Sequence, residues 1–246
     1  MEQARLDMSW KALYRAGGVS ALLFVLLVLV PVALVFLAPL PPTEGAPLLE
    51  YIAEHKAVYL TQLVCFVGLA VPAMIVFAAV TVALMDVNKS VALIGGLLGV
   101  ASEIIALALG SSPQSLHGGL VLLSDAYASA GTTAERAGLV SAADALIAAT
   151  NAVSWGGILT AAGILVLSVV MRRGVFGGPT AILGIVTGSI GIMSEALRPL
   201  IGSAYLVYGL LLPIWFAMVG WRLLRIDQPP HGPGHGDRAE PGQSPA

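Results

Sequence analysis

The chain contains long stretches without a single charged residue. Residues 16–42 carry no charge over 27 positions, and residues 57–85 carry none over 29 positions. About 20 apolar residues are enough for a helix to cross a bilayer, and a buried helix of a soluble protein explains one such stretch but not several. Charged residues make up 11% of the chain, against about 25% in soluble domains. The sequence therefore predicts an integral membrane protein whose main partner is the lipid bilayer.

The apolar stretches predict six membrane spans. Backbone polar groups within lipid must be satisfied inside the segment, so each span should be a helix and the fold class all-α. The predicted spans are residues 18–40, 57–84, 90–110, 147–171, 179–201 and 204–224. They form a transmembrane domain over 18–225, which follows an amphipathic cytoplasmic lead over 1–17. The tail over 226–246 is rich in proline and glycine, which predicts disorder.

Basic residues predict the orientation of these spans. With the N-terminus in the cytoplasm, nine lysines and arginines fall in cytoplasmic segments and three in outer segments. Because basic residues concentrate on the cytoplasmic side, both termini should be cytoplasmic in a multi-pass protein of the cell membrane. The long loop over 111–146 then lies outside. Within it, Thr132 and Glu135 have the spacing of a capping box, which predicts a helix starting near Thr133 and running into the fourth span. Residues 44–56 should form a helical lead into the second span.

Several classes of function lack their sequence signals. The net charge is −2 and no basic block is present, so nucleic acid is not an expected partner. The single cysteine, Cys65, leaves neither an internal disulfide nor a cysteine-based metal cluster. Zincin, nucleophile-elbow and phosphate-loop motifs are missing. No histidine lies in a predicted span, which argues against a membrane haem held by two histidines. We therefore expect no metal and no cofactor.

One pattern of small residues followed by an acid occurs twice. These residues recur every fourth position: Gly95, Gly99 and Glu103 in one span, and Thr187, Gly191 and Glu195 in another. On a helix, such positions fall nearly on one line. Aligned without gaps, residues 95–111 and 187–203 are identical at six of 17 positions. This suggests an internal duplication of a two-helix hairpin, made of spans two and three and of spans four and five.

Glycines on these spans predict close packing of helices. Glycine allows two helix backbones to approach one another in a membrane. The expected packing surfaces within the bundle are formed by Gly95, Gly99, Gly184, Gly188 and Gly191. A role of these glycines in dimerisation is the less favoured interpretation, and the oligomeric state is left open.

The two acids should face the interior of the bundle. An acidic side chain at the centre of a membrane helix costs about 2.5–3.5 kcal/mol, which makes exposure to lipid unfavourable. Glu103 follows Lys89 by 14 residues, or roughly 21 Å along a helix, which places it in the outer half of the membrane. Arg198 lies one turn after Glu195, whereas Glu103 has no basic residue in its own span. Desolvation should therefore favour the neutral form of Glu103.

Three functional hypotheses follow from these acids. In the first, a polar cavity in the outer leaflet binds or translocates a small molecule or a proton. Its predicted lining is Glu103, Glu195, Arg198, Asn151 and Gln62. In the second, the protein is structural or accessory, and the acids only form hydrogen bonds between helices. In the third and least favoured, Glu103 is the general acid or base of an intramembrane enzyme.

The layout resembles the DUF4386 family, a group of six-span bacterial membrane proteins of unknown function. The resemblance covers residues 12–225 and is carried by the lead into span one at residues 13–17, the long outer loop, and the segment 99–105 around Glu103. It implies the fold and the location but no activity. Members often carry an arginine one turn before this glutamate, where this chain has Gly99 and Val100.

Overall fold

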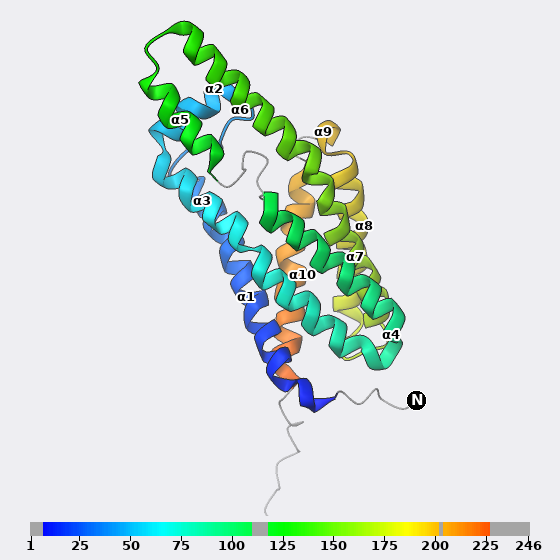
Figure 1. Cartoon of the computed structure of the whole chain (residues 1–246). Helices are drawn as coiled ribbons and strands as arrows, with labels where there is room; N and C mark the ends of the chain where they lie inside the picture. Colours follow the sequence, from blue (N-terminus) through cyan, green and yellow to red (C-terminus); the bar gives the residue numbers. More distant parts are fainter. Residues whose placement is uncertain (1–6, 110–117, 202–203, 227–246) are drawn as a thin grey trace, which may run out of the picture.

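The computed structural model describes residues 7–109, 118–201 and 204–226, apart from the side chains of residues 109, 153, 154, 198 and 199. Every regular element in these ranges is a helix, which confirms the all-α prediction (Figure 1). The longer helices are α1 (Lys11–Leu34), α2 (Gly45–Glu54), α3 (Lys56–Gly68), α4 (Ala70–Leu109), α5 (Gly119–Ser129), α6 (Thr133–Val153), α7 (Gly157–Met171), α8 (Gly178–Ala196) and α10 (Tyr205–Arg225). A short helix, α9 (Arg198–Ile201), follows α8.

Within the described ranges, five helical segments are long and apolar enough to cross a membrane. They are Met8–Leu34, Lys56–Ala108, Thr133–Met171, Gly178–Ala196 and Tyr205–Arg225. The segment Lys56–Ala108 contains 53 residues, far more than the roughly 20 that one crossing requires. It includes the second predicted span and residues 90–108 of the third. A multi-span membrane protein is thus supported by the length and composition of its helices.

The long helix α4 reverses direction at Asn88. The backbone of Asn88 is not helical, with φ −160° and ψ 99°, and its side-chain oxygen accepts a hydrogen bond of 3.1 Å from the amide of Val91. On either side of this break, Gly96 lies against Thr81 and Gly99 lies against Phe77. These pairs are nearly symmetric about Asn88, as expected for an antiparallel hairpin. Figure 1 shows the two arms of α4 side by side.

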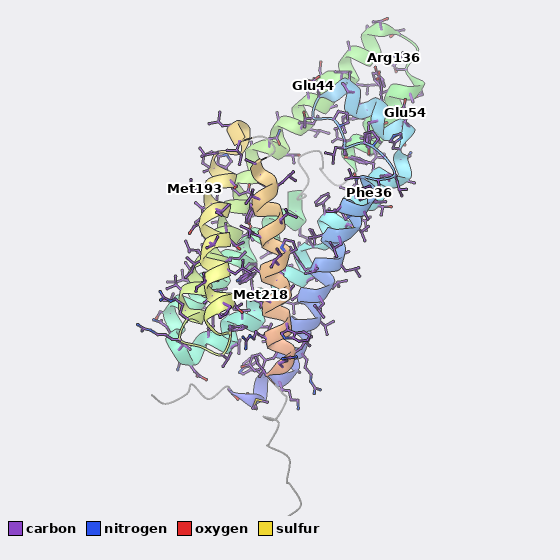
Figure 2. The ribbon with its side chains drawn as sticks, turned by 180° about the vertical axis from the view of Figure 1, so that it is seen from behind. Phe36, Glu44, Glu54, Arg136, Met193 and Met218 are labelled. Atoms are coloured by element: carbon purple, nitrogen blue, oxygen red, sulfur yellow. The ribbon has the colours of Figure 1, made fainter. Side chains whose placement is uncertain are left out.

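Five elements surround the main hydrophobic core: α1, both arms of α4, α7, α8 and α10. Aromatic rings fill its centre, where Phe24 stacks on Phe216 with 3.9 Å between ring centroids and Phe77 meets Phe216 edge-on at 6.2 Å. The outer surface of the bundle is also apolar, and side chains such as Phe36 and Met193 lie at its periphery (Figure 2). A bundle that is apolar both inside and outside is typical of a membrane domain.

A second hydrophobic cluster lies at the end of the bundle that is remote from the start of α1 and the end of α10 (Figure 1). It is formed mainly by α2, α5, part of α3 and part of α6, which we call the end module. Polar contacts tie these helices together. Asp144 of α6 accepts a hydrogen bond of 2.7 Å from the amide of Gly45, at the start of α2. Lys56 and Asp125 form a salt bridge of 2.7 Å between α3 and α5.

Both helices predicted outside the spans are present. The first, α2, occupies most of the predicted lead at 44–56. The second, α6, begins at Thr133, where the amide of Glu135 donates a hydrogen bond of 3.2 Å to the Thr132 hydroxyl. The Glu135 carboxylate in turn accepts a hydrogen bond of 3.1 Å from the amide of Gly131. This reciprocal arrangement satisfies amides at the start of α6, as a capping box does.

Two predicted spans are divided in the structure. The segment predicted at 147–171 contains the end of α6, a 3-10 turn at Ser154–Gly156, and then α7. The segment predicted at 179–201 breaks at Leu197, between α8 and α9. Pro199 explains this break because proline lacks the amide hydrogen that would bond to the carbonyl of Glu195, four residues earlier, and its ring clashes with that carbonyl in a continuous helix. The predicted disorder of the tail concerns residues 227–246, which lie outside the described ranges.

Candidate functional site

The first glycine stripe brings two helix backbones into contact. Gly163 of α7 packs directly on the second arm of α4. A Cβ atom added to Gly163 would lie 2.8 Å from the carbonyl oxygen of Gly95 and 2.8 Å from the amide nitrogen of Gly99. Since both are backbone atoms, neither can move aside without displacing a helix. Glycine at position 163 therefore permits this crossing of α4 and α7.

Glu103 lies at the end of this stripe and is 7% exposed. The hydroxyl of Thr160, on α7, is 3.2 Å from its Oε1 atom. The Ser102 hydroxyl is 2.5 Å from the Thr160 hydroxyl and also donates a hydrogen bond of 2.7 Å to the carbonyl of Gly156. Three consecutive contacts thus connect Glu103 to the start of α7.

The second glycine stripe packs α8 on α7 and α10. A Cβ atom at Gly188 would lie 2.7 Å from the carbonyl oxygen of Ala161 and 2.7 Å from both the amide nitrogen and the Cβ of Leu165. At Gly191 it would meet the ring of Tyr208 at 2.5 Å. Gly184 lies against Ser168 and Trp215, which are both fully buried. Both stripes therefore meet the backbone of α7, at Gly163 for the stripe on α4 and at Gly188 for the stripe on α8.

Glu195 ends the second stripe and is 4% exposed. The hydroxyl of Tyr205, on α10, donates a hydrogen bond of 2.7 Å to its Oε1 atom. Its carboxyl group rests on Gly157 of α7, where an added Cβ would lie 2.6 Å from the carboxyl carbon. Gly157 thus provides the space that the Glu195 carboxyl occupies.

The two acids flank the same turn of α7. Glu103 approaches it from α4 and contacts Thr160, while Glu195 approaches it from α8 and contacts Gly157. Residues 157 and 160 are three positions apart, or roughly 4.5 Å along a helix axis. The acids therefore lie at nearly the same level, in agreement with the repeat in the sequence. Both are buried and hydrogen-bonded between helices.

The other predicted lining residues have different positions. Gln62 is buried on α3, but the register of the α4 hairpin places the level of Glu103 near Ala73. Gln62 is 11 residues before Ala73, or roughly 16 Å along a helix, so the structure does not bring it beside Glu103. Asn151 is exposed near the end of α6. The side chain of Arg198 lies outside the part of the chain that the structure describes.

The residues that contact the acids were not identified from the sequence. Thr160 is a polar residue in an apolar span. This is a weak signal of a contact between helices, because the hydroxyl of a threonine can also bond to a backbone carbonyl of its own helix. Tyr205 has the position of an interfacial aromatic residue. No spacing rule relates either of them to an acid on another helix.

Within the described ranges, histidine, cysteine, aspartate and glutamate form no group of three that could hold a metal ion.

Comparisons with known proteins give no relative. No family model matches the chain, and neither a curated protein nor a solved structure matches it. The function must therefore be inferred from the site itself.

Proposed function

We propose that Glu103 is a proton-binding group inside the membrane, and that the protein binds or translocates a proton or a small polar molecule there. The proposal rests on a count of hydrogen atoms. Three hydrogen-bond contacts connect Glu103 to the carbonyl of Gly156, and each of them needs one hydrogen. Ser102 and Thr160 each have one hydroxyl hydrogen, whereas the contacts from Glu103 to Thr160, from Thr160 to Ser102 and from Ser102 to Gly156 require three.

A proton on Glu103 supplies the missing hydrogen. The neutral acid donates to the Thr160 hydroxyl, Thr160 donates to Ser102, and Ser102 donates to the carbonyl of Gly156. With an ionised Glu103, one of the three contacts has no hydrogen. An unmade hydrogen bond in a buried setting costs about 1–3 kcal/mol. Among the residues that the structure describes, no basic side chain forms a salt bridge with Glu103, so the local geometry favours a bound proton.

The first test is infrared spectroscopy of the purified protein and its Glu103→Gln variant. A protonated carboxyl group has a C=O stretching band that is distinct from the bands of a carboxylate. We expect the wild-type minus variant difference spectrum to contain this band at neutral pH, and to lose it on alkalinisation. A difference spectrum without a carboxylic acid band at any pH at which the protein stays folded would overturn the proposal.

The second test separates a binding role from a structural one. The amide of Glu103→Gln can donate to Thr160 as a neutral acid does, so its thermal stability should stay close to that of the wild type. Glu103→Leu removes the donor and should be less stable. A ligand or proton site further predicts that Glu103→Gln loses the stabilisation that pH or a small-molecule ligand gives to the wild type. A Glu103→Gln protein with wild-type responses to both would favour the alternative.

The alternative function is that of a structural or accessory membrane protein. It is favoured by Glu195, whose contacts join α8 to α10 through Tyr205 and to α7 through Gly157. Hydrogen bonds of this kind stabilise helix contacts in membranes. In this case the two acids fix the packing of α7 and no ligand is required.

The topology and the ancestry are also part of the proposal. We infer six spans, because α4 is a hairpin. We infer cytoplasmic termini, because seven of the described basic residues lie at the Asn88 end and two, Lys56 and Arg136, at the end module. The seven are Lys11, Arg15, Lys89, Arg172, Arg173, Arg222 and Arg225. A Gly131→Cys thiol in the end module should then react with an impermeant reagent from outside. Labelling only from the cytoplasmic side would indicate the opposite orientation of the protein in the membrane.

The duplication of the two hairpins and membership of a DUF4386-like family remain proposals from sequence.

A further inference from the structure

A cavity lies where the turn of the α4 hairpin meets the end of α7. Its volume is about 460 Å³, and it is lined by Val87, Asn88, Val91, Val169, Val170, Arg172 and Arg173. It belongs to the Asn88 end of the bundle, remote from Glu103, so its role is independent of the function proposed above. Asn88 fixes the shape of the turn because its side chain accepts the hydrogen bond from the amide of Val91.

The polar part of this cavity is positively charged. Arg172 and Arg173 follow directly after the last residue of α7 and are exposed. Within the described ranges, neither guanidinium group forms an ion pair or a hydrogen bond with a protein group. No acidic residue belongs to the lining. Arginine binds phosphate oxygens with two parallel hydrogen bonds, which makes this pair suited to a phosphate group.

The remaining wall of the cavity is apolar. Four valines form it, and one of them, Val169, is 52% exposed on the outer surface of the bundle. A free phosphate ion gains nothing from such a wall, whereas a lipid acyl chain does. Phosphate-binding and acyl-binding surfaces therefore adjoin one another at the level where a membrane helix ends.

We propose that this cavity binds an anionic phospholipid, with the phosphate on Arg172 and Arg173 and an acyl chain against Val169 and its neighbours. Basic pockets between membrane helices bind lipid headgroups by the same combination of charge and apolar contact. The ligand class is a phosphodiester lipid of the leaflet at the Asn88 end. Inorganic phosphate shares the headgroup chemistry but lacks the chain.

The test is native mass spectrometry of the purified protein with phosphatidylglycerol and with phosphatidylcholine of the same chain length. We expect selective retention of phosphatidylglycerol. The double variant Arg172→Gln/Arg173→Gln should bind it about 30-fold more weakly, the loss expected for two juxtamembrane charges. The matched control, Arg222→Gln/Arg225→Gln, removes two charges from α10 at the same end but outside the cavity lining, and should lose clearly less binding than the first double variant.

Two further measurements distinguish the source of the phosphate. Val169→Trp keeps both arginines but fills the mouth of the cavity, and should also weaken binding of phosphatidylglycerol. Inorganic phosphate at millimolar concentration should neither displace the lipid nor stabilise the protein. Stabilisation by inorganic phosphate that depends on Arg172 and Arg173 would assign the site to a free anion. Equal losses in the two double variants would show a nonspecific effect of net charge and overturn the lipid site.

Discussion

The two stripes of small residues and acid are alike in sequence but differ in what they contact. The stripe on α4 meets α7 backbone to backbone at Gly163, and its acid contacts the hydroxyl of Thr160. The stripe on α8 meets the α7 backbone at Gly188 and the ring of Tyr208 at Gly191, and its acid accepts a hydrogen bond from Tyr205. Both stripes thus make a backbone contact with α7, and they differ in the group that each acid contacts.

This difference shows which property the pattern specifies. Small residues on one line specify that another helix comes close, but the type of neighbour is specified by the partner helix. Gly163 and Gly157, both on α7, provide the complementary space for the α4 backbone and for the Glu195 carboxyl, respectively. The two stripes should therefore respond differently when α7 is changed.

The largest effect is expected for Gly163→Ala. Its methyl group would overlap the carbonyl of Gly95 and the amide of Gly99, and the backbone atoms can relax only if the helices separate. Overpacking of a well-packed core costs about 1–3 kcal/mol, and we expect a value at the upper end of this range. Thermal unfolding in detergent measures the loss.

A matched control for this substitution is Gly209→Ala on α10. A Cβ atom at position 209 has no heavy atom within 4 Å, and alanine is a better helix former than glycine by up to about 1 kcal/mol. This variant should equal or exceed the wild type in stability. If the two alanine variants lose the same stability, the backbone contact at Gly163 is not what holds α4 against α7.

A smaller effect is expected for Gly157→Ala. Its methyl group would meet the carboxyl group of Glu195, which is the end of a flexible side chain and can rotate away. We expect a loss of about 1–2 kcal/mol, at the lower end of overpacking effects. The loss should shrink when Glu195 is also replaced by alanine, with a coupling of at least about 0.5 kcal/mol in a double-mutant cycle. Additive losses would place the clash elsewhere.

How far the sequence predicts this structure depends on whether a feature is local. The helices at 45–54 and 133–153 follow from capping and composition, and the burial of Glu103 and Glu195 follows from the cost of an acid in lipid. The break before Pro199 was missed although its cause is local, because apolar residues resume after it at Leu200 and Ile201.

The partners of the acids could not be predicted because they depend on which helices are neighbours. Thr160 and Gly157 become relevant only when α7 lies between α4 and α8, and Gln62 is excluded only by the register of the α4 hairpin. A single sequence contains the residues for these contacts but gives no rule that pairs helices across the bundle. The acids were therefore predictable as buried groups, and their hydrogen-bond partners were not.

The smallest effects are expected for the two hydroxyl partners, and they compare the acids directly. Hydrogen bonds between membrane helices contribute about 0.6 kcal/mol on average and at most about 1.7 kcal/mol. Tyr205→Phe removes one contact, to Glu195, and should lose stability near the average value. Thr160→Val removes the hydroxyl that contacts both Glu103 and Ser102, and should lose more. Thermal unfolding of both variants under the same conditions measures the difference. If Tyr205→Phe proves the more costly, the connection through α10 is the stronger one, and the chain of contacts from Glu103 to Gly156 contributes little to the stability of the bundle.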